Sequence, residues 1–479
     1  MSRDAAGPSP AGPPAGPSAA LRRERRAWYV YDWANSAYVT TTGTVLFAPY
    51  LTAVATAAAC PDLPAGAGCD QTLSVLGVPV APGSLALYTT TVSTALSALL
   101  LPLVGALCDR VVRKRLLLGA FALVGATAAA SMVAVTGTDW QLGVVLQVVA
   151  GASLGASLVV YNALLLDLAG PDERDAVSSR GWALGYLGGF LLLAANLALV
   201  SGRDALGLTE SEAVRISLLT AGLWWGGFSL VPVLGLRDRP LRTAPSTPRR
   251  HRTGDGGALA RSRGALGGTV GELAETFRHA RGYPMTLLML VAYLFYNDGI
   301  QTVIYAASLF GTVELGLPQT QLITAILLVQ AVAFVGALVF GGLATRFGAW
   351  RTILWSLVAW TGVVAAGFLL PPGRFGLFLA LATAIGLVLG GTQAISRSLF
   401  SQLVPLGREA QYFALYQAAE RGTSWFGTLV FGLVFQLTGS YRPAIASLVA
   451  FFVVGGVLLL RVDVRRGIAD AGRDQPRRV

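Results

Sequence analysis

Four ionisable side chains lie inside stretches of the sequence that are otherwise apolar: Asp32, Asp298, Glu420 and Arg421. An ionised side chain at the centre of a membrane helix costs about 2.5 to 3.5 kcal/mol, so we expect each to face protein or a wet cavity. A carboxylate there can bind an ammonium group when ionised or take up a proton when dehydrated. We therefore predict that Asp298 and Glu420 are coupling residues. Arg421 leaves an alternative open, since it could hold either acid in a structural ion pair.

Neutral polar side chains gather around these charges. Near Asp298, polar residues recur every four positions and so share one helix face. We predict that a polar solute binds between such faces, and the candidate binding residues are Asn35, Asn162, Tyr296, Asn297, Gln301 and Gln393. The alternative is that these side chains join helices through hydrogen bonds worth about 0.6 kcal/mol each.

Scarce residues exclude several chemistries. Lys114 is the only lysine and has no Gly-Lys-Ser/Thr context, so a phosphate-binding loop for ATP is absent. Both histidines, His251 and His279, lie in one polar stretch, which argues against a zinc, haem or Ser-His site inside the membrane. We expect no enzyme, no metal and no cofactor. Cys60 and Cys69 share the segment CPDLPAGAGC and are predicted to form a disulfide if that loop faces an oxidising exterior.

The composition places all these residues in a polytopic membrane protein. The 479-residue chain is 54% hydrophobic and only 13% charged, against about 25% charge in an ordinary soluble domain. Twelve apolar stretches are long enough to cross a bilayer. They lie near residues 33–56, 85–107, 116–135, 142–166, 181–200, 216–234, 285–310, 322–343, 353–370, 375–396, 412–437 and 444–460.

The spans divide the chain into two halves of six. We expect a disordered tail over residues 1–26, a six-helix half over 27–235, a linker over 236–284, a second half over 285–464 and a C-terminal tail over 465–479. Residues 1–20 contain no signal-peptide core, so the chain is expected to start at residue 1. In the linker, Leu266 to Phe277 has the spacing of a short interfacial helix, although a basic tether around residues 243–264 fits the composition as well.

Basic residues set the expected orientation. Of the 36 lysines and arginines, only Arg203, Arg215, Arg374 and Arg442 fall in loops on the side opposite the termini. Because Lys and Arg are retained in the cytoplasm, both termini and the linker are predicted to be cytoplasmic, in the plasma membrane. The net charge of +11 is then explained without a nucleic acid partner.

An internal repeat links the halves. The segment GALCDRVVRKR from Gly105 recurs as GGLATRFGAWR from Gly341, at an offset of 236 residues. A second repeat relates the segment that begins at Pro171 to the one that begins at Pro405. Two repeats separated by nearly the same number of residues predict duplicated halves with a substrate site between them.

The repeated segment resembles the loop signature of the major facilitator superfamily, matching it at Gly105, Asp109, Arg110 and Arg113 among others. Five further strings, YDWANSAY, SSRGWALGYLGG, WW, FYNDGIQT and GGTQAISRSLF, are similar to the bacterial "unknown major facilitator" family, whose eukaryotic relatives are autophagy-linked vacuole effluxers. This resemblance implies an all-α membrane fold of twelve helices in two pseudo-symmetric halves. It also implies that Asp298 lies on a helix that lines the central cavity.

Together these observations predict a monomeric secondary transporter that moves a small polar solute by alternating access, driven by protons, and facilitated efflux without a coupling ion is left open. The resemblance implies that the solute is an amino acid or related metabolite and that it is exported. The alternatives are a multidrug or secondary-metabolite exporter and, less favoured, a lipid scramblase. The predicted gating residues are Asp32, Gly105, Asp109, Arg110, Arg113, Arg397 and Arg421. Asp109 and Arg113 are expected to hold the cytoplasmic ends of the halves together. Asp109 is expected to contact the start of the eleventh span near Tyr412, where the positive end of the helix dipole favours a carboxylate.

Overall fold

A computed structural model describes residues 18–62, 69–240, 278–422 and 424–479 of the chain. The first half contains α1 (Ala19–Tyr38), η1 (Val39–Leu46), α2 (Phe47–Ala59), β1 (Leu73–Val75), β2 (Val78–Val80), α3 (Pro82–Arg110), α4 (Lys114–Ser131), η2 (Met132–Ala134), α5 (Trp140–Leu168), η3 (Pro171–Glu173), α6 (Arg174–Ser201), η4 (Arg203–Leu206) and α7 (Glu210–Gly235). The second contains α9 (Pro284–Leu309), η5 (Phe310–Glu314), α10 (Gln319–Phe347), α11 (Ala349–Phe368), α12 (Phe375–Leu403), α13 (Glu409–Gly422), α14 (Ser424–Thr438), α15 (Tyr441–Ser447), α16 (Val449–Leu460) and α17 (Val464–Asp470).

The described residues form eleven helical segments that are long and apolar enough to cross a membrane. The first is continuous from Ala19 through η1, a π-helix, to Ala59. The predicted eleventh span consists of two shorter helices, α13 and α14, on either side of residue 423. With these two counted as one crossing, the helices follow the predicted order of six, linker and six.

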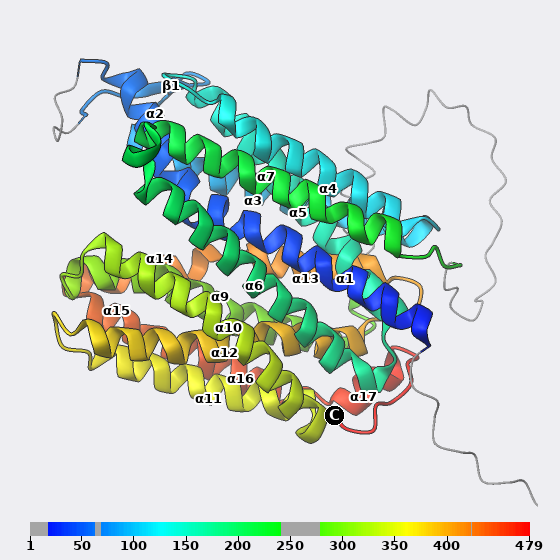
Figure 1. Ribbon diagram of the computed structural model, residues 1–479. Helices are drawn as coiled ribbons and strands as arrows, with labels where there is room; N and C mark the ends of the chain where they lie inside the picture. The colour runs from blue at the N-terminus through cyan, green and yellow to red at the C-terminus, as the bar shows by residue number, and fades with distance from the viewer. Residues whose placement is uncertain (1–17, 63–68, 241–277, 423) are drawn as a thin grey trace, which may run out of the picture.

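The helices of the two halves form two groups that lie side by side (Figure 1). Across the boundary, α6 packs on α10, and α13 packs on α3 and α5. Glycines permit the close approach of α3 and α13: a Cβ at Gly105 would lie 2.7 Å from the carbonyl oxygen of Ala410. In the first half Gly181, Gly185 and Gly189 of α6 face α1 or η1, which agrees with the packing role that small residues have in membrane helices.

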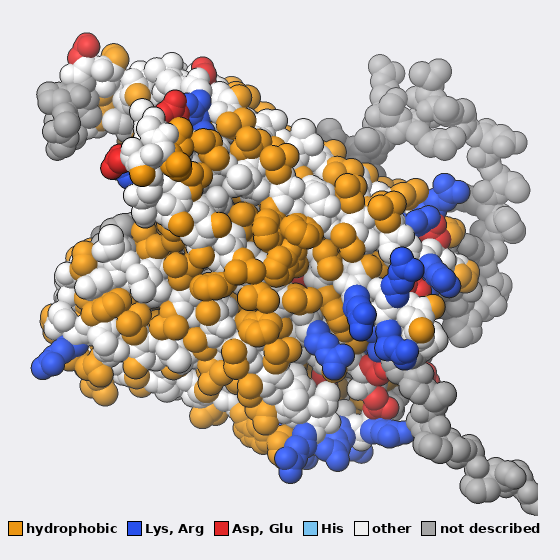
Figure 2. Space-filling view, in the orientation of Figure 1, with side chains coloured by type: hydrophobic (Ala, Val, Ile, Leu, Met, Phe, Trp, Pro, Cys, Tyr) orange, Lys and Arg blue, Asp and Glu red, His pale blue; other side chains and the backbone are white. Residues whose placement is uncertain are grey.

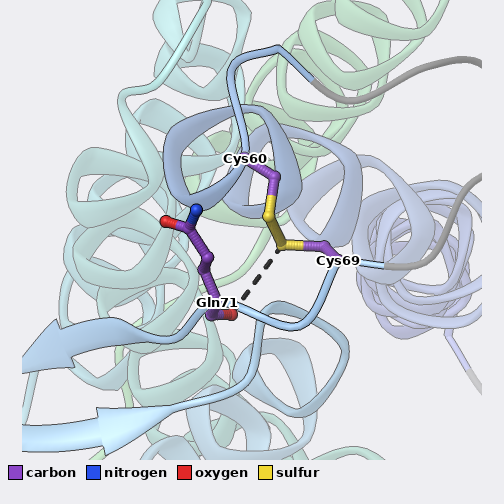
Figure 3. Close-up of a disulfide and its surroundings, with 3 residues drawn as sticks. All are labelled: Cys60, Cys69 and Gln71. Atoms are coloured by element: carbon purple, nitrogen blue, oxygen red, sulfur yellow. Dashed lines mark hydrogen bonds between the residues drawn. A yellow bond between two sulfur atoms is a disulfide. The ribbon is translucent and has the colours of Figure 1, made fainter.

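The two ends of the bundle differ in charge. Lys and Arg side chains gather at the end where α1 begins and α17 lies, which we call the basic end (Figure 2). The opposite end carries the β1–β2 hairpin and a disulfide between Cys60 and Cys69, and we call it the disulfide end (Figure 3). There, Sγ of Cys69 lies 3.8 Å from the carbonyl oxygen of Gln71. Figure 2 shows a notch between the halves at the disulfide end.

The expected disordered tail over residues 1–26 is too long. Helix α1 begins at Ala19, and the Ser18 side chain caps it by accepting from the backbone N–H of Leu21. Arg25 is buried because its guanidinium donates to the carbonyl oxygen of Leu168, 2.8 Å away, and pairs with Glu173. Composition alone could not show that these charges are compensated. Residues 1–17 and the predicted interfacial helix, Leu266 to Phe277, lie outside the described residues.

Candidate functional site

A buried ion pair connects the two halves. Asp32 on α1 and Arg397 on α12 lie 3.3 Å apart, and their side chains are 8% and 3% exposed. Arg397 donates through both terminal nitrogens to one oxygen of Asp32, and its Nε donates to the Ser178 hydroxyl at 2.9 Å. Because α1 and α6 belong to the first half and α12 to the second, these bonds can break only if the halves separate at this level.

Aromatic side chains enclose the pair. The Tyr161 hydroxyl donates to Asp32 at 2.7 Å, and Arg397 lies over the rings of Trp28, Tyr161 and Trp182 at 5.1 to 5.5 Å. The stacked rings exclude water and add cation–π attraction to the ion pair. Trp28 is fully buried, so it belongs to the protein interior and not to the lipid interface. We call Asp32, Arg397, Tyr161, Ser178 and Trp28 the arginine cluster.

A cavity of about 310 Å³ lies between the halves beside this cluster. Its wall is formed by α1, η1 and α6 on one side and by α9, α10, α12 and α13 on the other. Trp182 lines the cavity and contacts Arg397 of the arginine cluster. Ten apolar residues of the second half cover most of one face: Ile304, Ala307, Leu322, Ala325, Ile326, Val329, Phe378, Ala382, Ile385 and Leu389. The volume suits a small solute.

The polar part of the cavity is held in place by hydrogen bonds behind it. Gln393, which lines the cavity, donates to Oδ1 of Asn297 at 2.7 Å, and Asn297 in turn donates to the carbonyl oxygen of Glu420 at 3.3 Å. Glu420 and Gln301 also line the cavity. Oε2 of Glu420 accepts from Gln417 at 2.8 Å. Among the described lining residues Glu420 is the only charged one, so the cavity favours a cation at this position.

Asp298 faces away from this cavity. It is fully buried, and its Oδ2 accepts from the backbone N–H of Gly427 on α14 at 2.8 Å, whereas its Oδ1 has no hydrogen-bond partner in the described part of the chain. Arg421 pairs with neither Asp298 nor Glu420 among the described residues, and its buried Nε also lacks a partner there. The structural ion pair that the sequence left open is therefore not formed in this conformation.

The loop after α3 makes the contact expected from its motif. Both carboxylate oxygens of Asp109 accept from backbone N–H groups at the start of α13, from Ala410 at 2.9 Å and Gln411 at 3.0 Å. The negative charge caps a helix N-terminus of the opposite half. Arg113 does not share in this contact: it is exposed, and its side chain makes no hydrogen bond or ion pair with the described residues. Arg110 is exposed at the end of α3.

Further bonds between the halves were not foreseen from the sequence. The buried Arg174 donates to the side chain of Gln402 at 2.7 Å and to the carbonyl oxygen of Ser401 at 3.2 Å. Ser398 donates to Asp175 at 2.5 Å. These three bonds join α6 to α12 near the basic end. The repeat around Pro171 was the available signal, but the repeat alone does not show which side chains meet.

The predicted binding residues therefore separate into two groups. Gln301 and Gln393 line the cavity, and Asn297 supports Gln393 from behind. The others are buried in bonds of their own. Asn162 accepts from Arg397, Tyr296 bonds to the Ser396 hydroxyl, and Asn35 donates to the carbonyl oxygen of Tyr31 in its own helix.

Two pseudo-symmetric halves around a central cavity, with ionic contacts between them at one end, define a transporter of the major facilitator superfamily. The chain belongs to the family of vacuole effluxer Atg22-like proteins, whose model matches residues 20–472. It is 26% identical over 439 residues to the "uncharacterized MFS-type transporter YxiO" of Bacillus subtilis (strain 168), covering 91% of this chain and 94% of that one. It is 27% identical to autophagy-related protein 22 of Coccidioides immitis (strain RS), covering 83% and 75%. The class is one of transporters and not of enzymes.

Solved structures agree on the fold. The proton:xylose symporter XylE aligns with a TM-score of 0.62 over 92% of this chain and 95% of that chain, at 13% identity. FucP in its outward conformation aligns with a TM-score of 0.60 over 92% and 97%, also at 13% identity. At this identity the similarity shows the arrangement of the helices alone. It says nothing of the substrate of this chain.

Proposed function

We propose that the protein is a secondary transporter that exports a small solute bearing an amino group and an apolar side chain. The observation that carries this proposal is the cavity between the halves, where Glu420 is the one charged lining residue of the described chain and an apolar wall stands beside it. The ammonium group of such a solute pairs with Glu420, and its hydrocarbon side chain packs against the apolar wall of α10 and α12. Gln301 and Gln393 orient the solute by hydrogen bonds.

A free amino acid also carries a carboxylate, which needs a partner. We assign this role to Arg421, which directly follows Glu420 and whose buried Nε lacks a hydrogen-bond partner in the described part of the chain. Adjacent side chains of a helix point about 100° apart, so in this proposal the long Arg421 side chain swings toward the cavity during closure. In this proposal Glu420 and Arg421 recognise opposite ends of one zwitterion.

Proton coupling follows from competition for a carboxylate. Glu420 holds either a proton or the ammonium group of the solute, so release of one accompanies binding of the other. Asp298 is the second candidate, because it is buried with one oxygen unpartnered among the described residues. A charge that crosses 100 mV releases about 2.3 kcal/mol. A tenfold solute gradient costs about 1.4 kcal/mol, so one proton sustains roughly a fortyfold gradient.

The basic end is the cytoplasmic end in this proposal, and the membrane is the plasma membrane. The arrangement of basic residues at that end and the disulfide at the other supports this orientation (Figure 2). Labelling of single cysteines introduced into the linker tests it. A cysteine that reacts only with an external, impermeant reagent contradicts the orientation.

Thermal stabilisation of the purified protein tests the substrate class. The panel contains amino acids, amines that lack a carboxylate and carboxylates that lack an amine. We expect neutral apolar amino acids to raise the midpoint of unfolding in the native protein and to lose this effect in Glu420→Gln. Stabilisation by carboxylates alone, retained in Glu420→Gln, contradicts the proposal.

The apolar wall also favours a second candidate function, export of apolar organic cations such as drugs. Such a compound occupies the same wall and Glu420 but has no carboxylate for Arg421. Arg421→Gln separates the two: it abolishes stabilisation by amino acids and leaves stabilisation by amines unchanged. If amines alone stabilise the native protein, the second function replaces the first.

A further inference from the structure

The two copies of the repeated loop make different contacts. In the first copy, Asp109 caps α13 of the opposite half. The second copy keeps the close approach, because a Cβ at Gly341 would lie 2.6 Å from Cβ of Ser179 on α6. Thr345, however, stands at the position equivalent to Asp109, and its hydroxyl donates to the carbonyl oxygen of Gly342 in its own helix. A carboxylate therefore joins the halves at the first copy of the loop, while the second copy has a neutral side chain that bonds within its own helix.

A hollow of about 260 Å³ lies beside Thr345. Thr345 lines it from the second half, and Asp172 and Asp175 line it from the first, just before and within the first turn of α6. The remaining wall includes Arg477 and Arg478, from the end of the chain. Residues 473–479, which we call the C-terminal strap, therefore lie between the halves on the side of the second loop.

The strap is anchored to the second half. Its first residue, Arg473, forms an ion pair with Glu409 at 3.0 Å, and the two side chains are only 3% and 5% exposed. Arg473 also donates to the carbonyl oxygen of Val404. At the other end of the strap, Arg478 donates to the carbonyl oxygen of Arg346, and Val479 packs against the core.

Between these anchors the strap reaches across to the first half. The backbone N–H of Arg477 donates to Oδ1 of Asp172 at 2.6 Å, and its guanidinium lies 3.7 Å from Oδ2. Asp172 lies two residues before the start of α6, and Asp109 lies in the last turn of α3. A carboxylate of the first half is thus held by donors of the second half at both positions, by the backbone of α13 in one case and by the strap in the other.

We propose that Arg477 and Asp172 form a second cytoplasmic gate contact. It holds the two halves together beside the second copy of the loop, as the contact of Asp109 with α13 does beside the first. The inference rests on the alternating-access cycle of the proposed function. For the basic end to open, the first half must leave both α13 and the strap. The strap therefore favours the conformation that is closed at this end, and its release is part of the inward-opening step.

Cysteine accessibility in purified protein without substrate tests this proposal. Ala394→Cys, in a Cys108→Ala background, places a probe at a fully buried position between the halves, where Ser178 donates to the carbonyl oxygen of residue 394. Arg477→Ala and Asp172→Asn should each increase the rate of maleimide labelling roughly two- to fivefold, the range expected for an exposed ion pair. The double variant should label no faster than the faster single variant.

A matched control is available in α17. Arg466 is similarly exposed, but it pairs with Asp470 inside its own helix, 3.8 Å away. Arg466→Ala should therefore leave the labelling rate unchanged. Equal acceleration by Arg466→Ala and Arg477→Ala, or no acceleration by Arg477→Ala and Asp172→Asn, overturns the proposal.

Thr345→Lys tests whether a cation from the second loop can replace the strap. The lysine shares the hollow with Asp172 and Asp175, so it should slow the labelling of Arg477→Ala toward the native rate. Labelling that stays fast refutes the role of Asp172 as the acceptor of this contact. Asp109→Asn distinguishes failure of this proposal from failure of the transport cycle: if Asp109→Asn accelerates labelling and the strap variants do not, only the strap role is wrong. If no variant accelerates labelling, the gating cycle itself is contradicted.

Discussion

Asp32 and Glu420 are both carboxylates inside the helix bundle, but their surroundings differ. One oxygen of Asp32 accepts from Tyr161 and from two nitrogens of Arg397, and the pair is enclosed by aromatic rings. Glu420 accepts from the neutral Gln417, lines the cavity and forms no ion pair among the described residues. A carboxylate held in an ion pair joins the two halves, whereas a carboxylate outside an ion pair can accept a ligand or a proton. This difference separates the proposed gate from the proposed binding site.

The largest expected effect comes from breaking the compensated pair. Asp32→Asn leaves the Arg397 guanidinium buried without a countercharge, and we expect a loss of about 3 to 5 kcal/mol in the free energy of unfolding. The double variant Asp32→Asn/Arg397→Gln removes both charges and should recover most of this loss. Thermal unfolding and the yield of monodisperse protein measure both variants. A double variant as unstable as Asp32→Asn contradicts the assignment of the loss to an unpaired charge.

The sequence was sufficient to predict the order of the helices, because twelve long apolar stretches leave little choice inside a bilayer. It also singled out Asp32, Arg397 and Asp109 as candidate gating residues, because a charge in a membrane helix or in a repeated motif is visible without coordinates. It could not tell which carboxylate faces the cavity. Asp298 and Glu420 look alike in the sequence, and only the packing of α9 against α14 shows that Asp298 points away.

The bonding partners could not be predicted for a related reason. Tyr161, Ser178 and Trp182 lie on three turns of two helices, and the sequence offers no rule for which side chains of packed helices meet. The spacing of Trp182 and Tyr186 by four residues within SSRGWALGYLGG was a signal for one shared face, and both side chains do line the cavity. Arg397, which contacts Trp182 from the opposite half, is 215 residues away in the chain.

The next effect tests Glu420, the carboxylate that lines the cavity. Glu420→Gln keeps the size of the side chain and the hydrogen bond with Gln417 but removes the charge, so we expect gradient-driven transport in proteoliposomes to fall by at least about tenfold, the equivalent of 1.4 kcal/mol. Folding should be retained. Glu314→Gln is the matched control, because Glu314 pairs with Arg442 outside the cavity. Normal transport by Glu420→Gln together with loss in Asp298→Asn would move the coupling role to Asp298.

A smaller effect is expected at the loop after α3. Asp109→Asn keeps one oxygen acceptor for the start of α13 but loses the second acceptor and the charge, so the conformation open at the basic end should gain population by about tenfold or less. The labelling rate of Ala394→Cys measures this shift, with expression unchanged. Arg113→Ala serves as the control and should have no effect, since its side chain is exposed and unbonded among the described residues. Acceleration by Arg113→Ala would restore the role that the motif assigns to it.

The smallest effect is expected at the disulfide, because it lies at the edge of the bundle and connects residues only nine positions apart. Replacing Cys60 and Cys69 by serine should leave transport unchanged, lower the midpoint of unfolding only slightly and make the loop between α2 and β1 more sensitive to protease. Reduction of the native protein should produce the same sensitivity. Intact mass provides the direct measurement: after denaturation without reductant one thiol, Cys108, should be alkylated, and after reduction all three. Two alkylated thiols in the loop of protein purified under oxidising conditions would mean that this end of the bundle does not face an oxidising compartment, and the proposed orientation of the gate and of the strap would then have to be reversed.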